Sequence, residues 1–409
     1  MFARILNVYR AAFAGLPRDV WRLAFAVLVN RSGAMVLPFL GLYVTEARGL
    51  PESAAAAVLV AYGCGSIGGT IAGGALCNRV GALKVQQLSL VGAGFCYFII
   101  PITRSFPLLL AVVALASFVA DAFRPATMTA VVDAAPGPVR TRALALIRLA
   151  ANLGFSVGPT VGGILASFDY FWLFVGDAVT CWMACFVIAR AARRQVPPPG
   201  AHASGAPGGA DNARRAAHRD GPFLGLLALS FVLTLALFQT FSTLPLFLHD
   251  SYGLGERTIG LLLGSNGLMI ALFEMVLLRR VEVYPPLRVV AIGSALLCGG
   301  LALLPLGRGI LLAIAAMTVL TVGEMLSLPM TNSLAASRGG PGSRGAYMGM
   351  YSAAFSAAFI VAPPAGLFIY SHFGGNALWF AVGGLAPLLA AGSLLLGRAF
   401  RADAGGPPH

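Results

Sequence analysis

A small set of ionisable side chains interrupts otherwise apolar stretches of this 409-residue chain, and these are its best candidates for chemistry. They are Arg31, Asp121, Arg124, Arg148, Asp177, Glu274 and Glu324. An ionisable group in an apolar environment costs several kcal/mol unless it is paired or hydrated. Each of these residues is therefore a candidate for binding protons, ions or charged ligands.

Two of the carboxyl groups, Glu324 and Asp121, are the candidate proton-coupling residues. Desolvation favours the protonated form of a carboxyl group, whereas a neighbouring arginine favours the ionised form. Asp121 has Arg124 one turn further along, but Glu324 has no basic residue one turn away in the sequence. Glu324 is therefore the predicted proton carrier, and Asp121 is predicted to stay ionised as a counter-ion or a substrate contact. Two other interpretations of Glu324 remain open: contact with a cationic substrate, and a buried carboxyl group satisfied within the protein.

The elements that must position these groups are long apolar segments. Hydrophobic residues make up 58% of the chain and charged residues 11%, and the mean hydropathy is +0.83, which is incompatible with a water-soluble surface. A helix of about 20 apolar residues crosses about 30 Å of hydrocarbon. Twelve segments have this character, near 21–45, 54–77, 84–103, 106–132, 141–167, 170–190, 222–248, 257–281, 287–306, 309–336, 345–371 and 376–398. The predicted fold class is an all-α polytopic membrane protein with twelve transmembrane helices.

The two halves of the chain repeat at a spacing of 204 residues. Pro125 and Pro329 are separated by this distance, and so are Arg140 and Arg344. Residue pairs that recur at one constant spacing indicate tandem duplication of one folding unit. Two pseudo-symmetric six-helix bundles about one axis are the plan of many secondary transporters.

The basic residues indicate the orientation of the helices. With both termini in the cytoplasm, the basic residues that fall in outer loops are only Arg48, Arg104, Arg257 and Arg308. This asymmetry follows the positive-inside rule and predicts a multi-pass protein of the cell (inner) membrane. The net charge of +13 then reflects topology and contact with anionic lipid, and no nucleic-acid partner is expected.

The domain boundaries follow from the same pattern. We expect an interfacial amphipathic helix over 1–18, an N-terminal bundle over 19–190 and a C-terminal bundle over 222–400. A flexible cytoplasmic linker over 191–221, rich in Pro, Gly, Ala and Arg, separates the bundles, and residues 401–409 form a cytoplasmic tail. The six cysteines lie in apolar stretches and are expected to act as small packing residues.

Two motifs add to this interpretation. In the fifth segment a GxxxGPxxGG pattern is formed by Gly154, Gly158, Pro159, Gly162 and Gly163. Its glycines allow close approach of a neighbouring helix, and the proline removes one backbone donor. The loop after the second segment contains Gly74, Asn78, Arg79, Gly81 and Lys84.

These motifs resemble those of the major facilitator superfamily, and within it the twelve-helix drug:proton antiporters. The fifth-segment pattern resembles the family's antiporter motif, and the loop resembles its cytoplasmic gating motif. Asn78 stands where the family has Asp, which weakens the charge contact of the gate, and the family's arginine early in helix 4 would fall near Ala114 and is absent. A helix-packing seam with no transport role is the alternative interpretation of the glycine pattern.

The resemblance implies positions for the charged groups. Helices 1, 4, 7 and 10 of that family line a central cavity, so Arg31, Asp121 and Glu324, each about 15–18 Å from the cytoplasmic helix ends, are expected to converge there. Arg31 and Arg124 would supply cavity charge, and Arg31 is expected to pair with Asp121.

Helices 5 and 8 touch in that family, which suggests an inter-bundle pair of Arg148 with Glu274. The alternative is that Arg148 reaches the headgroups and that Glu274 bonds within its own bundle.

The wall of the cavity should be apolar and aromatic, as suits ligands of varied shape. The candidates are Phe39, Tyr43, Phe123, Phe238, Phe241, Met269, Tyr351 and Phe355, with Gln239, Asn266 and Asn332 as the polar groups that would orient a ligand. For each apolar candidate the alternative interpretation, a core or lipid-facing residue, is the more common one.

The function most consistent with these features is proton-coupled transport by alternating access, with efflux of small amphipathic molecules or drugs by proton antiport. Proton-coupled uptake of a metabolite is the alternative, and a membrane-embedded enzyme or a non-transporting membrane protein is the alternative of another class. The histidines have no partner at metal-ligand spacing and no phosphate-binding loop is present, so neither a metal site, a cofactor nor ATP hydrolysis is expected. The expected partners are a small-molecule substrate, protons and the lipid bilayer, and we expect a monomer.

Overall fold

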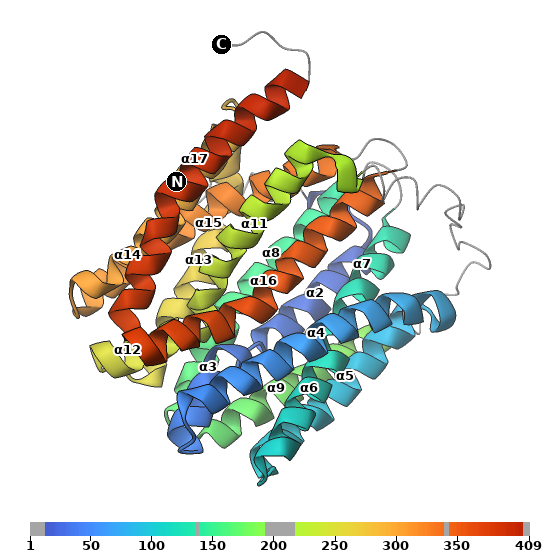
Figure 1. Ribbon diagram of the computed structural model, residues 1–409. Helices are drawn as coiled ribbons and strands as arrows, with labels where there is room; N and C mark the ends of the chain where they lie inside the picture. Colours follow the sequence, from blue (N-terminus) through green and yellow to red (C-terminus); the bar gives the residue numbers. More distant parts are fainter. Residues whose placement is uncertain (1–12, 136–138, 193–216, 339–342, 404–409) are drawn as a thin grey trace. The chain divides into compact units, whose positions relative to one another are not determined.

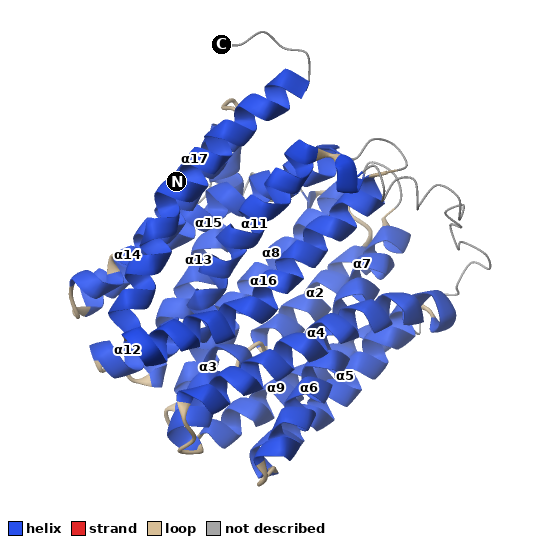
Figure 2. Cartoon of the chain, in the orientation of Figure 1, coloured by secondary structure: helices blue, strands red, loops and turns tan. Residues whose placement is uncertain are grey.

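The protein is built from long helices, and a computed structural model describes residues 13–135, 139–192, 217–338 and 343–403 (Figure 1). In these residues the ordered elements are all helical, with no strand (Figure 2). Twelve helices in the described residues are long and apolar enough to cross a membrane. The predicted fold class is therefore confirmed.

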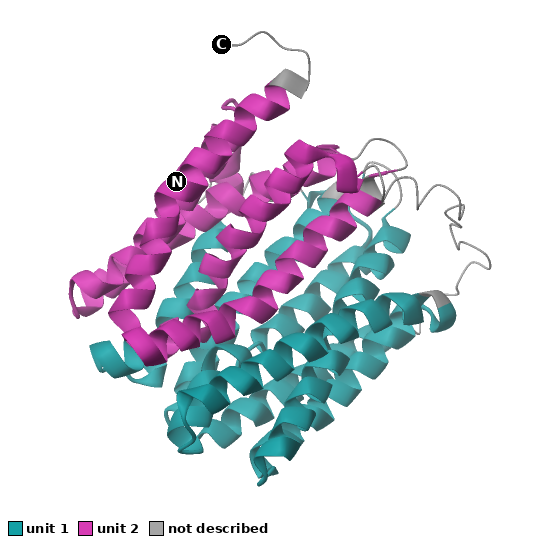
Figure 3. Ribbon diagram, in the orientation of Figure 1, with its two compact units in different colours: residues 1–202, 248–272 teal, residues 203–247, 273–409 magenta. Residues whose placement is uncertain are grey.

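The chain forms two compact units (Figure 3), which are described separately. The first comprises residues 1–202 and 248–272, and the second comprises 203–247 and 273–409. Residues 248–272 group with the first unit, and the expected boundaries of the two bundles remain a prediction. The expected interfacial helix over 1–18 and the expected linker over 191–221 lie largely outside the described residues, as does most of the tail over 401–409.

The helices of the first half are α2 (Arg18–Ser32), α3 (Val36–Leu42), α4 (Glu52–Val80), α5 (Ala82–Ile99), α6 (Phe106–Asp121), α7 (Phe123–Ala134), α8 (Val139–Ala166) and α9 (Tyr170–Ala192). A π-helical turn over Tyr43–Ala47 continues α3. Within the first unit α4 packs against α6, α5 against α9, and α2 against both α8 and α9.

The helices of the second half are α11 (Gly221–Ser242), α12 (Leu244–Tyr252), α13 (Glu256–Val281), α14 (Pro286–Ala302), α15 (Ile310–Arg338), α16 (Arg344–Phe373) and α17 (Gly375–Asp403). In the second unit α14 packs against α15 and α17, and α11 packs against α16. The predicted seventh span extends to 248, but α11 ends at Ser242. Pro245 has no N–H to donate to the carbonyl of Phe241, which explains the interruption.

The repeat of the sequence is visible in where the helices begin. The pairs α4 and α13, α5 and α14, and α6 and α15 start at Glu52 and Glu256, Ala82 and Pro286, and Phe106 and Ile310, each pair 204 residues apart. The duplicated pattern therefore corresponds to duplicated helices.

A polar cluster ties three helices of the second unit together where α11 begins. Asp220 is the N-cap of α11 and accepts from the backbone N–H of Phe223 at 3.1 Å. Arg338 at the end of α15 donates to both oxygens of Asp220, from Nε at 2.6 Å and Nη2 at 2.9 Å. The hydroxyl of Tyr347 on α16 donates to the same carboxylate at 3.1 Å. Burial opposes ionisation, but these hydrogen bonds outweigh it and lower the pKa of Asp220.

We expect Asp220→Asn to destabilise the protein by about 1.5–3 kcal/mol at neutral pH, because it removes charge-assisted hydrogen bonds from a side chain that is 9% exposed. A lowered pKa in the folded state stabilises the protein above the unfolded value of 3.8, and this stabilisation is lost as the pH falls below it. The difference in thermal unfolding temperature between wild type and Asp220→Asn should therefore be largest at pH 6 and should decrease below about pH 4. Asp133→Asn, at an exposed carboxylate on α7, is the control. A difference that persists unchanged at pH 3 would contradict the assignment.

Candidate functional site

A network of polar and ionisable side chains occupies the interior of the first unit. Arg31 on α2 interacts electrostatically with Asp121, Arg124, Tyr62 and Tyr97. Asp177 on α9 interacts with Arg31 as well. The network therefore collects groups from α2, α4, α5, α6, α7 and α9 around one arginine.

Asp121 occupies the junction between α6 and α7. Pro125 cannot donate a backbone hydrogen bond to the carbonyl of Asp121, so α6 ends there and α7 begins at Phe123. Arg124 Nε lies 3.7 Å from Asp121 Oδ1, with the Asp121 side chain 13% exposed and the Arg124 side chain 57% exposed. The ion pair described for Asp121 is thus with Arg124, and Arg31 attracts Asp121 from a longer distance. Arg124 is therefore an exposed member of the network.

Asp177 bonds directly to the backbone of the first span, which is not one continuous helix. Residues 33–35 separate α2 from α3, and Asp177 Oδ2 accepts from the backbone N–H of Val36 at 3.0 Å. Asp177 is 4% exposed. The sequence marks Asp177 as an ionisable residue in an apolar segment, but it carries no signal that this carboxylate meets a helix break 141 residues earlier.

The glycine motif of α8 packs against two different helices. A Cβ at Gly154 would lie 2.7 Å from the carbonyl oxygen of Leu28 on α2, and one at Gly162 would lie 2.9 Å from Met35 Cβ. A Cβ at Gly163 would lie 2.3 Å from the carbonyl oxygen of Glu256 on α13. The absence of side chains therefore lets α8 approach α2 on one face and α13 on another.

The loop with the predicted gating residues joins α4 to α5. Gly81 has a φ of +87°, a conformation that other residues rarely adopt, so it permits the tight turn between the helices. Arg79 and Lys84 are exposed, and Gly74 lies inside α4 near Pro125. The side chain of Asn78 lies outside the described part of the structure, and the effect of Asn at this position remains a prediction.

The aromatic residues predicted in the first half are interior packing residues in the first unit. Phe39 is fully buried on α3, and Phe123 is 3% exposed. Tyr43 packs edge-on against Phe174 with ring centroids 4.8 Å apart, and its hydroxyl accepts from Arg48 Nη1 at 3.2 Å. Contact of these residues with a ligand remains a prediction.

Asn266 and Met269 also belong to the first unit, on α13. Asn266 is buried and Met269 is half-buried. The exposed Arg148 lies on α8 in the first unit, whereas Glu274, 7% exposed, lies on the part of α13 that belongs to the second unit. Pairing between Arg148 and Glu274 remains a prediction.

An aromatic cluster lies between α11 and α16 in the second unit. The ring of Phe238 lies 5.1 Å from that of Phe355, 6.4 Å from that of Phe241 and 4.8 Å from that of Phe359. Three members of this cluster, Phe238, Phe241 and Phe355, are residues that the sequence analysis proposed for a cavity wall.

The polar candidates of the second unit have different surroundings. The amide of Gln239 donates to the carbonyl of Ala362 at 2.8 Å, and its oxygen accepts from the hydroxyl of Thr243 at 2.9 Å, so Gln239 ties α11 to α16. The hydroxyl of Tyr351 lies 3.0 Å from that of Thr331. Asn332 is exposed and Glu324 is half-buried on α15. A role for these groups in ligand orientation or proton transfer remains a prediction.

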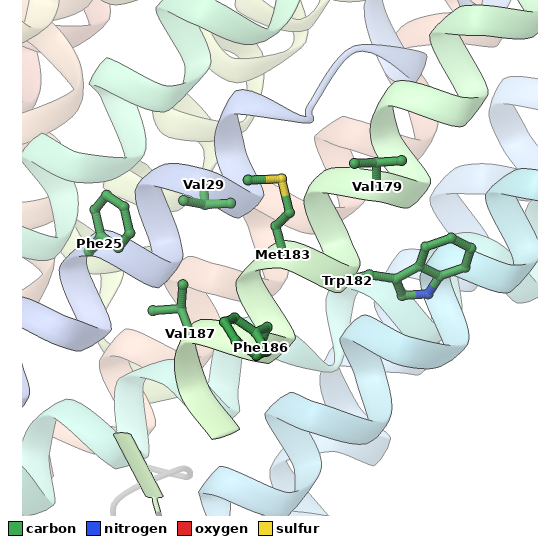
Figure 4. Close-up of a pocket in the computed structure, with 7 residues that line it drawn as sticks. All are labelled: Phe25, Val29, Val179, Trp182, Met183, Phe186 and Val187. Atoms are coloured by element: carbon green, nitrogen blue, oxygen red, sulfur yellow. The ribbon is translucent and has the colours of Figure 1, made fainter. Parts of the chain in front are cut away.

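An apolar groove that the sequence analysis did not anticipate lies between α2 and α9 (Figure 4). Its volume is about 370 Å³, and it is lined by Phe25, Val29, Val179, Trp182, Met183, Phe186 and Val187. Phe25, Met183 and Phe186 are more than half exposed. The groove therefore opens on the outer face of the first unit and offers no charged group to a ligand.

A second unanticipated feature is a group of possible metal ligands in the first unit. One ligand atom from each of Glu46, His249 and Asp250 lies within 4.8 Å of the others. Glu46 is about 200 positions from the other two in the chain, so spacing could not reveal the group. Glu46 and Asp250 are exposed, and exposed acidic groups commonly cluster without binding an ion. By itself this group does not define a metal site.

The twelve apolar helices of the described residues are those of a polytopic membrane protein, and ionisable groups within such helices are typical of transporters. The sequence profile of the Major Facilitator Superfamily matches residues 23–351, and the chain belongs to this superfamily.

Among its relatives is the MFS-type transporter YttB of Bacillus subtilis (strain 168), 24% identical over 368 residues, 89% of this chain and 91% of that protein. A Na(+), Li(+), K(+)/H(+) antiporter of Planococcus maritimus is 24% identical over 373 residues, 84% of this chain and 87% of that protein.

Solved structures show the same fold. A POT family transporter in complex with 5-aminolevulinic acid aligns with a TM-score of 0.79 at 14% identity, covering 95% of this chain and 97% of that one. A point mutant of the nucleoside transporter NupG aligns with a TM-score of 0.76 at 15% identity, covering 94% of this chain and 99% of that one. The resemblance to the major facilitator superfamily is therefore confirmed, and the chain is a multi-pass membrane protein of the secondary-transporter kind.

Proposed function

We propose that this protein is a proton-coupled transporter that works by alternating access and exports small amphipathic molecules in exchange for protons. The observation that carries this proposal is the network in which the half-buried Arg31 interacts with the buried Asp121 and Asp177 in membrane-spanning helices. Ionisable groups at this depth are costly, and in transporters they mark ion and proton pathways. The network joins six helices of one unit, so a change of protonation in it acts on the whole unit.

Glu324 is the proposed proton carrier of the second unit. It lies half-buried in the middle of α15, and α15 begins 204 residues after α6, the helix that ends at Asp121. The two carboxyl groups are thus carried by helices related through the repeat. Asp121 forms an ion pair with Arg124 at 3.7 Å, so the proposed division of roles assigns charge balance to Asp121 and proton transfer to Glu324.

Export of amphipathic substrates is supported by the glycine motif of α8 and by the aromatic residues of α11 and α16. The motif's close contacts with α2 and α13 fit an element that holds helices together during a rocking movement. We also propose that the protein is a monomer in the inner membrane with both termini in the cytoplasm. Arg148 and Glu274 are proposed to pair when the cytoplasmic side closes.

Exchange of monovalent cations for protons is a second candidate function. It is favoured by the relative from Planococcus maritimus that is named as a Na(+), Li(+), K(+)/H(+) antiporter. Uptake of a metabolite by proton symport uses the same fold and the same carboxyl groups, and it predicts the opposite substrate direction.

Inverted membrane vesicles that contain the protein test these functions. When a pH gradient is imposed with the vesicle interior acidic, a fluorescent amphipathic cation should accumulate in the vesicles. Collapse of the gradient by a protonophore should abolish the accumulation. Vesicles without the protein are the control. If dye does not move but added Na⁺ or K⁺ dissipates the pH gradient, cation antiport replaces drug export. Gradient-driven loss of solute from the vesicles would indicate uptake in the cell.

A further inference from the structure

The first span contains a built-in break, and its sequence explains why. Pro38 has no N–H to donate to the carbonyl of Ala34, and Gly33 is a poor helix former. The α2 helix therefore ends at Ser32, and α3 begins again at Val36. The N–H groups at the start of α3 have no partner within the helix and must bond elsewhere.

Asp177 supplies that partner. Its Oδ2 accepts from the N–H of Val36 at 3.0 Å, whereas the N–H of Met35 donates to the carbonyl of Gly33 at 2.6 Å. Asp177 is buried in the first unit, so water does not compete for the Val36 donor. A backbone hydrogen bond thus ties the start of α3 to α9 through this carboxylate.

Two other helices, α8 and α9, are in close contact with the break. A Cβ at Gly33 would lie 1.8 Å from Thr180 Oγ1 and 3.0 Å from Asp177 Oδ1 on α9. On α8, a Cβ at Gly158 would lie 3.1 Å from the carbonyl oxygens of Arg31 and Ala34. The break is therefore held between α8 and α9, and Asp177 is its polar attachment to α9.

The groups that face Asp177 from the neighbouring helices have mixed charge. Arg31 on α2 is the cation that attracts it. Tyr62 on α4, Tyr97 on α5 and Cys181 on α9 are the neutral titratable groups. Asp121 on α6 acts on both tyrosines, and Arg124 on α7 acts on Tyr62. Asp177 is therefore part of the network but is separated from the Asp121–Arg124 pair.

We propose that Asp177 is a proton-binding site that controls the break in the first span: the ionised carboxylate clamps α3 to α9, and the protonated acid releases it. An ionised carboxylate only accepts hydrogen bonds, whereas the protonated acid must place its own donor and loses one of its acceptor positions. Protonation therefore weakens the hydrogen bond from the N–H of Val36 and shifts the balance toward a state in which α3 can turn relative to α2. The link from this movement to transport rests on the proposed function, but the clamp does not.

Hydrogen–deuterium exchange of the peptide covering residues 33–40 measures the clamp directly. The full-length protein is examined in lipid nanodiscs from pH 5 to pH 9, without substrate or gradient, and rates are corrected for the intrinsic effect of pH. In wild type, protection of this peptide should fall at least about tenfold as the pH is lowered, following a single protonation. Asp177→Asn should show the low protection at every pH.

Two further variants make the outcome specific. Asp169→Asn makes the same change at an exposed carboxylate just before α9, which accepts from the N–H of Phe171 at 2.8 Å, and should behave as wild type. Asp177→Glu keeps a carboxyl group that can bind a proton, so protection of the peptide 33–40 should still change with pH. Exchange in wild type that does not depend on pH overturns the proposal, even if Asp177→Asn fails to fold. A pH step that persists unchanged in Asp177→Asn also overturns it. Because the measurement uses no gradient, a positive result stands even if the protein does not couple transport to protons.

Discussion

Glu324→Gln should reduce gradient-driven substrate movement at least about tenfold while leaving substrate exchange without a gradient largely intact. Glutamine keeps the size and one acceptor of the side chain but cannot carry a proton, so coupling is lost and the shape of α15 is retained. The measurement compares accumulation in inverted vesicles under an imposed pH gradient with counterflow at uniform pH. Loss of a proton carrier should affect the first and spare the second.

The control for this change is Glu282→Gln, at an exposed carboxylate just beyond the end of α13. It should match wild type in both assays. If the Glu324→Gln protein still moves substrate against its gradient at the wild-type rate, Glu324 is not the carrier. If both assays fail together, Glu324 serves substrate binding instead, which was the second interpretation of this residue.

Gly260→Ala should destabilise the protein by about 1–3 kcal/mol and impair transport, because it forces α8 and α13 apart. A Cβ at Gly260 would lie 2.2 Å from the carbonyl oxygen of Pro159 and 3.0 Å from Gly163 Cα. Both neighbours are backbone atoms of α8, so no side chain can rotate away. Thermal unfolding in detergent measures the stability, and the vesicle assay measures the transport.

Gly384→Ala is the matched control, since Gly384 lies inside α17 and a Cβ there would meet nothing within 4 Å. Alanine is the better helix former, so this variant should be unchanged or slightly more stable, by roughly 0.5–1 kcal/mol. Equal unfolding temperatures for the two variants would show that α8 and α13 are not in the close contact described. The same result would remove support for the antiporter motif as a packing element between these helices.

The sequence alone determined the number and approximate positions of the apolar spans, the repeat and the family. A helix rises 1.5 Å per residue, so a run of apolar residues translates directly into a membrane span. The starts of α4 and α13, 204 residues apart, show that the repeat was a property of the folded elements. The expected depth of Asp121 and Glu324 in the membrane rests on the same arithmetic and remains a prediction.

Interruptions within spans were only partly predictable. Pro125 divides α6 from α7, whereas Pro329, its counterpart in the repeat, lies inside the continuous helix α15. A proline removes one donor in both places, but the surrounding packing decides whether the helix bends or ends. The break at residues 33–35 likewise depends on a carboxylate that the local sequence does not contain.

Only the tertiary structure decided which side chains meet. It joined Asp177 to Val36 across 141 residues, directed the glycines of α8 toward α2 and α13, and engaged Gln239 with the backbone of α16. Hydropathy reports how deep a residue lies because the helical rise is constant. It does not report which neighbour a residue faces, because that depends on how side chains and bare glycine backbones of distant segments fit together.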